Sequence, residues 1–237
     1  SATTVDFRLI VAYRRSYFGN PNLGDTFQPG AFNFGDGSSA SYRFEVIALN
    51  QQEDWIIGQA YVVGGDPGVV RHTYPAATRS NGEPWEAYLS SCCRISSLRN
   101  SADSNFRYAT RVDLSLGNTS PVSSVPPIVS CPRGACRFSI PVVDANNDPI
   151  RWSLTPLSES GIRRNPTGLT VDPQTGIVDW TDGSSAESLG LYALSVTIED
   201  LDDNGDAKSS VVTDFLINLQ DFVNKAPRVR HAAVTSA

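Results

Sequence analysis

Residues 191–219 decide the fold of this chain, and they read LYALSVTIEDLDDNGDAKSSVVTDFLINL. In the first part, apolar side chains occupy every second position, at Tyr192, Leu194, Val196 and Ile198. The last part repeats the alternation, with apolar side chains at Val211, Phe215, Ile217 and Leu219, and only Thr213 breaks it. A period of two turns one row of side chains into a core and the other into water. Asp-Asn-Gly between the two parts tolerates the positive φ of a tight turn. The stretch therefore predicts an antiparallel hairpin.

The same signal recurs along the chain. Residues 5–13 and 106–116 alternate in the same way, and residues 42–49 and 55–63 are also strand-like. Residues 81–100 fit two structures, because their apolar positions match either a helix that begins after Asn81 or a strand through Trp85, Ala87 and Leu89. We favour the strand, and predict an all-β protein.

Length and composition limit the class of protein. The chain has 237 residues, long enough for two domains that each bury a core. Hydrophobic residues make up 40% and charged residues 19%, as in a folded soluble protein. A net charge of -6 with scattered basic residues argues against a nucleic-acid partner. The chain has no run of 18 apolar residues, so we expect no membrane-spanning segment.

Several features predict an exported protein, extracellular or on the cell surface. The chain begins at Ser1 and contains no methionine, which suggests that it is processed or excised. Four cysteines, an even number, favour an oxidising compartment. Asn118 heads the sequence Asn-Thr-Ser and is a candidate N-glycosylation site.

Two segments of the first part resemble the signatures of PKD-type immunoglobulin-like modules. They are Phe32-Asn33-Phe34-Gly35-Asp36-Gly37 and Val70-Arg71-His72-Thr73-Tyr74-Pro75. The resemblance implies a β-sandwich, and it implies a strand in the ambiguous region 81–100.

The proline-rich residues 120–127 have the composition of a stiff linker, which predicts a domain boundary. Residues 1–122 would form the PKD-like domain and residues 123–222 a second domain. Residues 223–237 would be a C-terminal linker or tail. Together these predictions describe two tandem immunoglobulin-like β-sandwich domains.

The second domain carries a series of motifs that resembles cadherin-like and related immunoglobulin-type repeats of surface proteins. The series runs D-x-N-x-D-P from Asp144, P-x-G-L-x-V-D from Pro166, T-G-I-V-x-W from Thr175, and then Gly190-Leu191-Tyr192. Asn224-Lys225-Ala226-Pro227 resembles the start of an interdomain junction in such arrays.

Two acidic stretches are candidate calcium sites. In the first, oxygen ligands recur at alternate positions around a glycine, at Asp200, Asp202, Asn204 and Asp206. Position twelve of such a loop would be Val211 in place of a glutamate, so this is no EF-hand. A solvated hairpin tip is the favoured alternative, because Asp, Asn and Gly are common in turns. The second stretch, Asp144, Asn146 and Asp148, resembles the acidic linker of cadherin repeats. No other cofactor is expected.

The cysteines are disulfide candidates whose pairing the sequence leaves open. Cys131 and Cys136 flank a short loop, so paired flanking strands would bring them to disulfide distance. Cys92 and Cys93 are adjacent, and they either bond to each other or bond elsewhere. Four cysteines allow three pairings.

No catalytic site is predicted. The two histidines, His72 and His231, fall in a structural motif and in the tail, and no nucleophile or metal-protease motif occurs. The tryptophans Trp55, Trp85, Trp152 and Trp180 would be either core anchors, which we favour, or a face for stacking sugars.

The sequence therefore favours a non-catalytic structural or adhesive protein, a surface or filament-building glycoprotein module whose partners are other protein chains. One extension is assembly by strand exchange, in which residues 5–13 or the tail complete the sheet of a neighbouring subunit. The alternative is a carbohydrate-binding module of a larger secreted protein, with glycans as partners.

Overall fold

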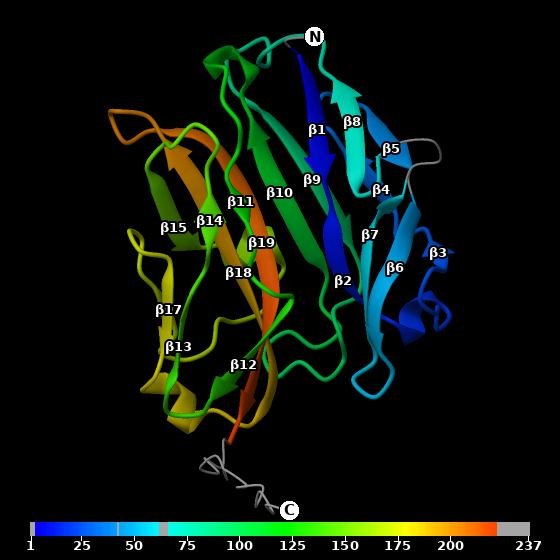
Figure 1. The fold of residues 1–237 in the computed structure, drawn as a ribbon, viewed down its shortest axis with the longest axis vertical. Coiled ribbons are helices and arrows are strands. Elements are labelled where there is room, and N and C mark those ends of the chain that lie inside the picture. Colours follow the sequence, from blue (N-terminus) through cyan, green and yellow to red (C-terminus); the bar gives the residue numbers. More distant parts are fainter. Residues whose placement is uncertain (1–2, 42, 62–65, 222–237) are drawn as a thin grey trace, which may run out of the picture.

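The computed structural model describes residues 3–41, 43–61 and 66–221 (Figure 1). Its regular structure is almost all β, which confirms the predicted fold class. The strands of the first half, residues 3–112, are β1 (Thr4–Arg8), β2 (Ile10–Arg14), β3 (Thr26–Phe27), β4 (Ala31–Asn33), β5 (Ser39–Ser41), β6 (Arg43–Asn50), β7 (Trp55–Tyr61), β8 (Val69–Thr73), β9 (Trp85–Ser91) and β10 (Phe106–Val112).

The second half, residues 122–221, is also built mainly of strands. Its strands are β11 (Val122–Ser123), β12 (Ile128–Pro132), β13 (Cys136–Ser139), β14 (Val142–Val143), β15 (Ile150–Leu154), β16 (Thr170–Val171), β17 (Ile177–Trp180), β18 (Gly190–Leu201) and β19 (Ala207–Gln220). The described part of the chain also has four short helical turns: η1 (Ser16–Phe18), η2 (Leu114–Leu116), α1 (Leu157–Ser160) and η3 (Gly183–Ala186).

The predicted hairpin is present and is the longest strand pair. β18 and β19 pair antiparallel from Gly190↔Leu219 to Leu201↔Ala207. Tyr192, Leu194 and Ile198 are fully buried, as their alternation predicts. At the tip, the Asp202 carboxylate accepts hydrogen bonds from the backbone N–H groups of Asn204 and Asp206, both at 2.9 Å.

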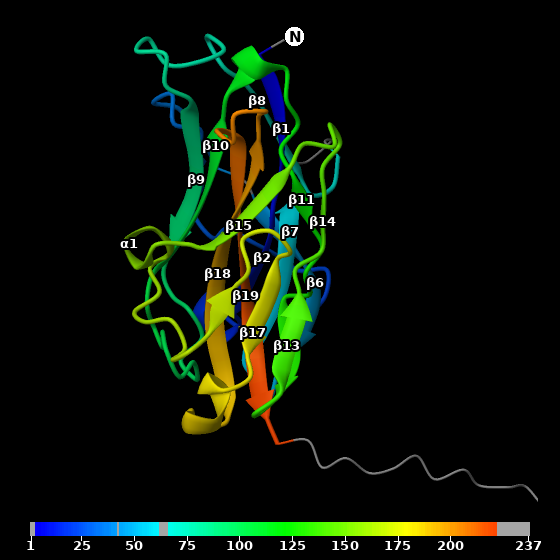
Figure 2. The same cartoon turned by 90° about the vertical axis from the view of Figure 1, so that its left-hand side faces the viewer.

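One large sheet runs through both halves. Its strand order is β15-β18-β19-β10-β9-β4-β5, and β12 pairs in parallel with β19. Figures 1 and 2 show this sheet as one layer and the smaller sheets as a second layer. The two halves therefore lie side by side. The boundary near residue 122 stays a prediction, because a single sheet crosses it.

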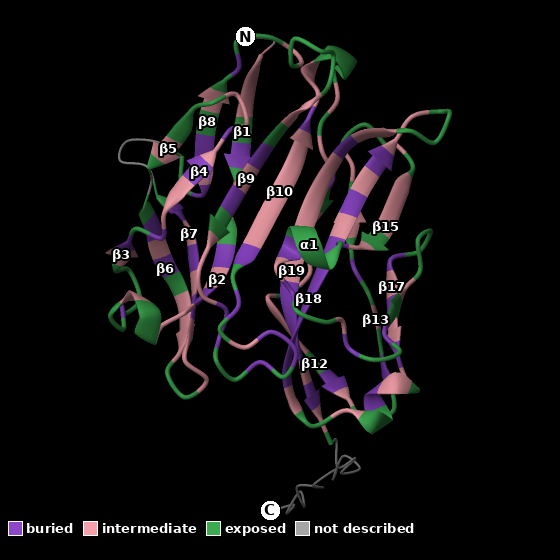
Figure 3. Cartoon of the chain, turned by 180° about the vertical axis from the view of Figure 1, so that it is seen from behind, coloured by how far each residue is buried: buried purple, intermediate pink, exposed green. Residues whose placement is uncertain are grey.

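Each half has its own core between the layers. In the first half the core is rich in aromatic side chains, among them Phe7, Tyr13, Phe32, Phe44 and Phe106. In the second half the core is built around Trp180, Tyr192, Phe215 and Ile217. Figure 3 shows the buried positions along the strands of the large sheet.

The N-terminal strand changes partners at Leu9. β1 pairs antiparallel with β8 and β2 with β7. Leu9 joins the two, since its N–H donates to the carbonyl of Gly68 and its carbonyl accepts from the N–H of Ala60. The alternation of residues 5–13 thus predicts one strand correctly, although two separate sheets share it.

Three other predictions can be compared with the structure. Within residues 81–100 the strand is confirmed, as β9. The strand predicted over 106–116 ends at Val112, and η2 follows because the Asp113 carboxylate accepts from the N–H of Ser115. The segment predicted as a linker contains β11, which pairs with β14 through Val122 and Val143, so it packs on the second half. The tail 223–237, with its junction-like Asn-Lys-Ala-Pro, lies outside the described residues.

The two signature segments of the first half meet in space. The ring of His72 stacks on Phe34 with centroids 3.8 Å apart, and its Nε2 lies 2.8 Å from the Asp36 carboxylate. The hydroxyl of Tyr74 donates to the carbonyl of Phe34. Gly35 adopts a φ of +83°, and a Cβ there would lie 2.2 Å from the carbonyl oxygen of Glu86. The PKD-type resemblance itself stays a prediction.

Candidate functional site

The two halves are held together at a seam between β10 and β19. These strands pair at two positions, Thr110↔Val211 and Arg111↔Ser210. The hydroxyl of Thr110 also donates to the carbonyl of Ser210 at 2.7 Å. So short a ladder contributes little alone, and further contacts reinforce it.

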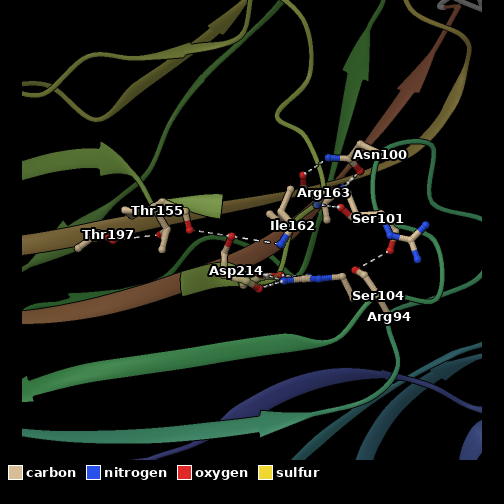
Figure 4. A network of polar contacts seen from close by, with 12 residues as sticks. Arg94, Asn100, Ser101, Ser104, Thr155, Ile162, Arg163, Thr197 and Asp214 are labelled. Carbon is tan, nitrogen blue, oxygen red and sulfur yellow. Dashed lines mark hydrogen bonds and ion pairs between the residues drawn. The ribbon is translucent and has the colours of Figure 1, made fainter. Parts of the chain in front are cut away.

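A buried ion pair crosses the seam (Figure 4). Arg94, which follows β9, donates two hydrogen bonds to the Asp214 carboxylate on β19, at 2.8 and 2.7 Å. The two side chains are only 4% and 6% exposed. Burial lowers the pKa of Arg94, but the charge and hydrogen bonds of Asp214 outweigh it and hold that pKa above its ordinary value. Arg94 also donates to the carbonyl of Ser160 at 3.0 Å.

The loop that carries Arg94 closes over the second half. We name residues 94–104 the clasp loop. The Asn100 side chain donates to the carbonyls of Ala193 and Arg164 and accepts from the N–H of Ala193, at 2.8 to 3.0 Å (Figure 4). An apolar cluster lies beneath the loop and draws on both halves, with members Ile95, Leu98, Ile162, Leu191, Ala193 and Leu216. The clasp loop thus covers the outer face of β18 and β19.

An acidic cluster is the candidate metal site. Asp144 and Asp148, from the loop between β14 and β15, meet Asp200 near the end of β18. Each offers one carboxylate oxygen, and these oxygens all lie within 4.8 Å of one another. Calcium binds oxygens at about 2.3–2.6 Å, so oxygens on one ion can stand up to roughly 5 Å apart. The spacing therefore fits calcium.

Two buried oxygens at this cluster have no hydrogen-bond partner within the described residues. They are Oδ2 of Asp144 and Oδ1 of Asn118. Asn118 reaches the cluster from the chain that connects the halves, and its Nδ2 donates to the Asp200 carboxylate. Burying an oxygen without a partner is unfavourable, and a bound cation is one kind of group that satisfies such an oxygen.

The charge of the cluster is only partly balanced. Lys208 Nζ lies 2.5 Å from the Asp148 carboxylate, and this hydrogen bond raises the pKa of Lys208. Three carboxylates thus face one ammonium within the described part of the chain. Asp200 is fully buried and accepts from the N–H and hydroxyl of Ser209, which fix its position.

The structure brings together three of the seven predicted calcium ligands, Asp144, Asp148 and Asp200. Asn146 lies between Asp144 and Asp148 in the chain and accepts from the N–H of Thr119, the neighbour of Asn118. Asp202, Asn204 and Asp206 form the hairpin tip, where backbone hydrogen bonds to Asp202 lower its pKa. These three side chains therefore match the solvated-tip alternative.

The four cysteines form two disulfides, Cys92–Cys93 and Cys131–Cys136. The second links β12 to β13, with its Cα atoms 4.9 Å apart. The first lies between β9 and the clasp loop. The glycosylation of Asn118 stays a prediction, and it would require the amide to leave Asp200.

The four tryptophans pack against the cores, as favoured. Trp180 is fully buried, Trp85 packs on the first core, Trp152 on the second, and Trp55 on the cluster beneath the clasp loop. Trp55, Trp85 and Trp152 are half-buried. Among the described residues, the helices are too short or too polar to span a bilayer.

Residues 1–115 match the family model described as Integrin beta-like protein A-E, N-terminal. The chain is 30% identical over 233 residues to Integrin beta-like protein A of Dictyostelium discoideum, an alignment that covers 92% of this chain and 11% of the relative. It is 29% identical over 213 residues to Integrin beta-like protein E of the same organism, covering 84% of this chain and 10% of the relative. The chain thus spans about a tenth of the length of these curated relatives.

Similar solved structures are cadherin ectodomains. Human Protocadherin-24 EC1-2 aligns with a TM-score of 0.34 at 19% identity, over 44% of each chain. Drosophila N-cadherin EC1-3 aligns with a TM-score of 0.31 at 15% identity, over 82% of this chain and 63% of that one. The sequence relatives are more informative: the first 115 residues match the N-terminal family of integrin beta-like proteins A-E, and the similarity to those proteins continues through the second half.

Proposed function

We propose that this chain is a non-catalytic, extracellular module of an adhesion protein. The observation that carries the proposal is the similarity to integrin beta-like proteins along 92% of the chain. Those relatives are about ten times longer, so the chain would be one part of a larger surface protein whose partners are other proteins.

The seam supports a mechanical role. An adhesive module under load would need its two halves to stay together. The ion pair between Arg94 and Asp214, the clasp loop and the shared sheet all oppose separation of the halves. A lateral pair of sandwiches would therefore present a broad, fixed surface.

Two experiments test the proposal. Antibodies against the folded chain should label intact cells of the source organism without permeabilisation. Surfaces coated with the purified chain should retain those cells, whereas surfaces coated with the heat-unfolded chain should not. Labelling that requires permeabilisation, or equal retention on both surfaces, would contradict the proposed role.

We also propose that the acidic cluster binds calcium. Asp144, Asp148, Asp200 and Asn118 would hold the ion through side-chain oxygens, and Lys208 would move away from Asp148. Because Asn118 belongs to the chain between the halves, the ion would tie that connection to the second half. The two unpartnered oxygens support this assignment.

A further inference from the structure

The first half has a long strand edge that no other strand covers among the residues that the structure describes. Within the described part of the chain, β1 pairs with β8 alone and β2 with β7 alone. The backbone hydrogen bonds show which residues face these partners. The N–H of Arg15 donates to the carbonyl of Asp54, and the N–H of Tyr74 donates to the carbonyl of Thr3. Leu9 bonds to Gly68 and Ala60, which lie on the same side of the strand. In an antiparallel ladder, successive residues direct their backbone groups to opposite edges. Odd-numbered residues therefore bond to β8 and β7, and even-numbered residues from 4 to 14 direct their N–H and C=O groups to the open edge.

This edge faces a groove of about 960 Å³. Residues 4–14 line one side and residues 118–125 another, while strands β10 and β19 contribute the floor. Figure 1 shows β10 between β11 and the pair β1 and β2. On the floor, β19 of the second half pairs with the edge of β10.

The groove has an apolar floor and rim. Phe106, Val112 and Phe215 contribute to its lining. At the rim, Ile10 is 62% exposed and Val122 is 59% exposed. Unpaired backbone groups beside such a surface suit an extended peptide, which forms a ladder along the edge and directs alternate side chains to the floor.

The charge of the groove favours an acidic occupant. Outside the buried pair of Arg94 and Asp214, its lining holds three arginines against two aspartates, whereas the whole chain carries a net charge of -6. Arg8 is exposed on the outward row of the edge strand, and it makes no ion pair among the described residues. An outward acidic side chain on an added strand would lie next to it.

We propose that the groove binds an extended segment of a partner protein, which adds as a strand to residues 4–14. Its inward side chains are apolar and its outward side chains acidic. This inference rests on the proposed adhesive function, for which it names the contact. It also reverses the direction of the predicted strand exchange, since β1 and β2 stay in their own chain and receive a strand.

The probe is a nine-residue peptide of alternating glutamate and valine, titrated by calorimetry into the whole chain. We expect saturable binding. A copy with N-methyl groups on alternate backbone amides should bind at least about tenfold more weakly, because it cannot complete the ladder. Equal binding of both peptides, or no binding at millimolar concentration, would overturn the inference.

Two variants locate the site. Ala12→Pro removes an N–H that points away from β7, so the fold should survive, as a melting curve would verify. It should raise the Kd of the glutamate peptide by up to about tenfold, the effect of one lost hydrogen bond. Arg8→Glu should raise that Kd about two- to fivefold and favour a peptide with lysine in place of glutamate. The matched control Arg137→Glu, on β13 outside the groove, should change neither value. If Ala12→Pro folds and binds normally, the site is wrong.

The outcomes separate the two proposals. If the coated surface retains cells but the chain ignores both peptides, the edge inference fails and the adhesive function stands. If the glutamate peptide binds as described but no cells are retained, the groove binds extended peptides while the adhesive function fails.

Discussion

The ion pair across the seam can be tested by removing one of its charges. In Arg94→Met, the Asp214 carboxylate would remain buried without its counter-charge. Because both side chains are at most 6% exposed, the pair belongs to the buried class, in which loss of one partner costs about 3–5 kcal/mol. The free energy of unfolding of a domain is typically about 5–15 kcal/mol, so the variant should still fold.

Urea denaturation measures the change in the free energy of unfolding. Hydrogen exchange should show where it acts, with faster exchange along the clasp loop and β19 than in β6 and β7. The double variant Arg94→Met/Asp214→Leu should recover much of the loss, since no charge remains buried. A matched control is Arg71→Met, whose partner is Asp6.

The control pair is exposed: its two side chains are 62% and 45% exposed to solvent. Arg71→Met should therefore lower the free energy of unfolding by less than about 1 kcal/mol. If Arg94→Met were as mild as Arg71→Met, the ion pair would not hold the seam and the reasoning would be refuted. A double variant less stable than Arg94→Met would also contradict it.

Three further predictions concern the acidic cluster, a glycine and a carboxylate. Millimolar calcium should raise the melting temperature and EDTA should reverse the rise, since a ligand of the native state stabilises it. Asp148→Asn should abolish this rise in melting temperature, and Asp202→Asn, at the hairpin tip, should leave the rise unchanged. If calcium does not raise the melting temperature of the unmodified chain, the site is excluded. Gly35→Ala should destabilise by about 2 kcal/mol or more in urea, because its Cβ would meet the backbone of the neighbouring strand. Gly37 is also at positive φ but has open space around it, so Gly37→Ala should lower the free energy of unfolding by about 1 kcal/mol. If both variants lost the same stability, the close approach of Gly35 to Glu86 would not explain the result. A hydrogen bond from Arg164 lowers the pKa of Glu187 from 4.5 to about 2. The stability that this ion pair adds to the fold is therefore present above pH 4.5 and is lost as the pH falls toward 2. Glu187→Gln should therefore be less stable than the unmodified chain at pH 7 by about 2 kcal/mol and similar to it at pH 2, and a difference that persists at pH 2 would count against this assignment.

The candidate site was only partly predictable. Asp144, Asp148 and Asp200 all stand out in the sequence as acidic residues near turns. The sequence does not show that these three residues meet, because their meeting depends on how the loop before β15 lies against the end of β18. Asn118 stands out as a glycosylation signal, and nothing local indicates that its oxygen lies buried beside carboxylates.

The sequence by itself determined the long strands, the hairpin and the row of each strand that faces the core. The other row of β18 was predicted to lie in water, but Leu191, Ala193 and Ser195 are buried, because the clasp loop covers that face. Alternation of side chains is a local property, and so are the turn preferences of Asp, Asn and Gly. The pairing of β10 with β19 is different, because every residue offers the same backbone N–H and C=O at a strand edge, and side-chain patterns do not name the partner. Only the tertiary structure decided that the two halves share a sheet, that the clasp loop covers the seam, and that no strand of the described residues pairs with the outer edge of residues 4–14.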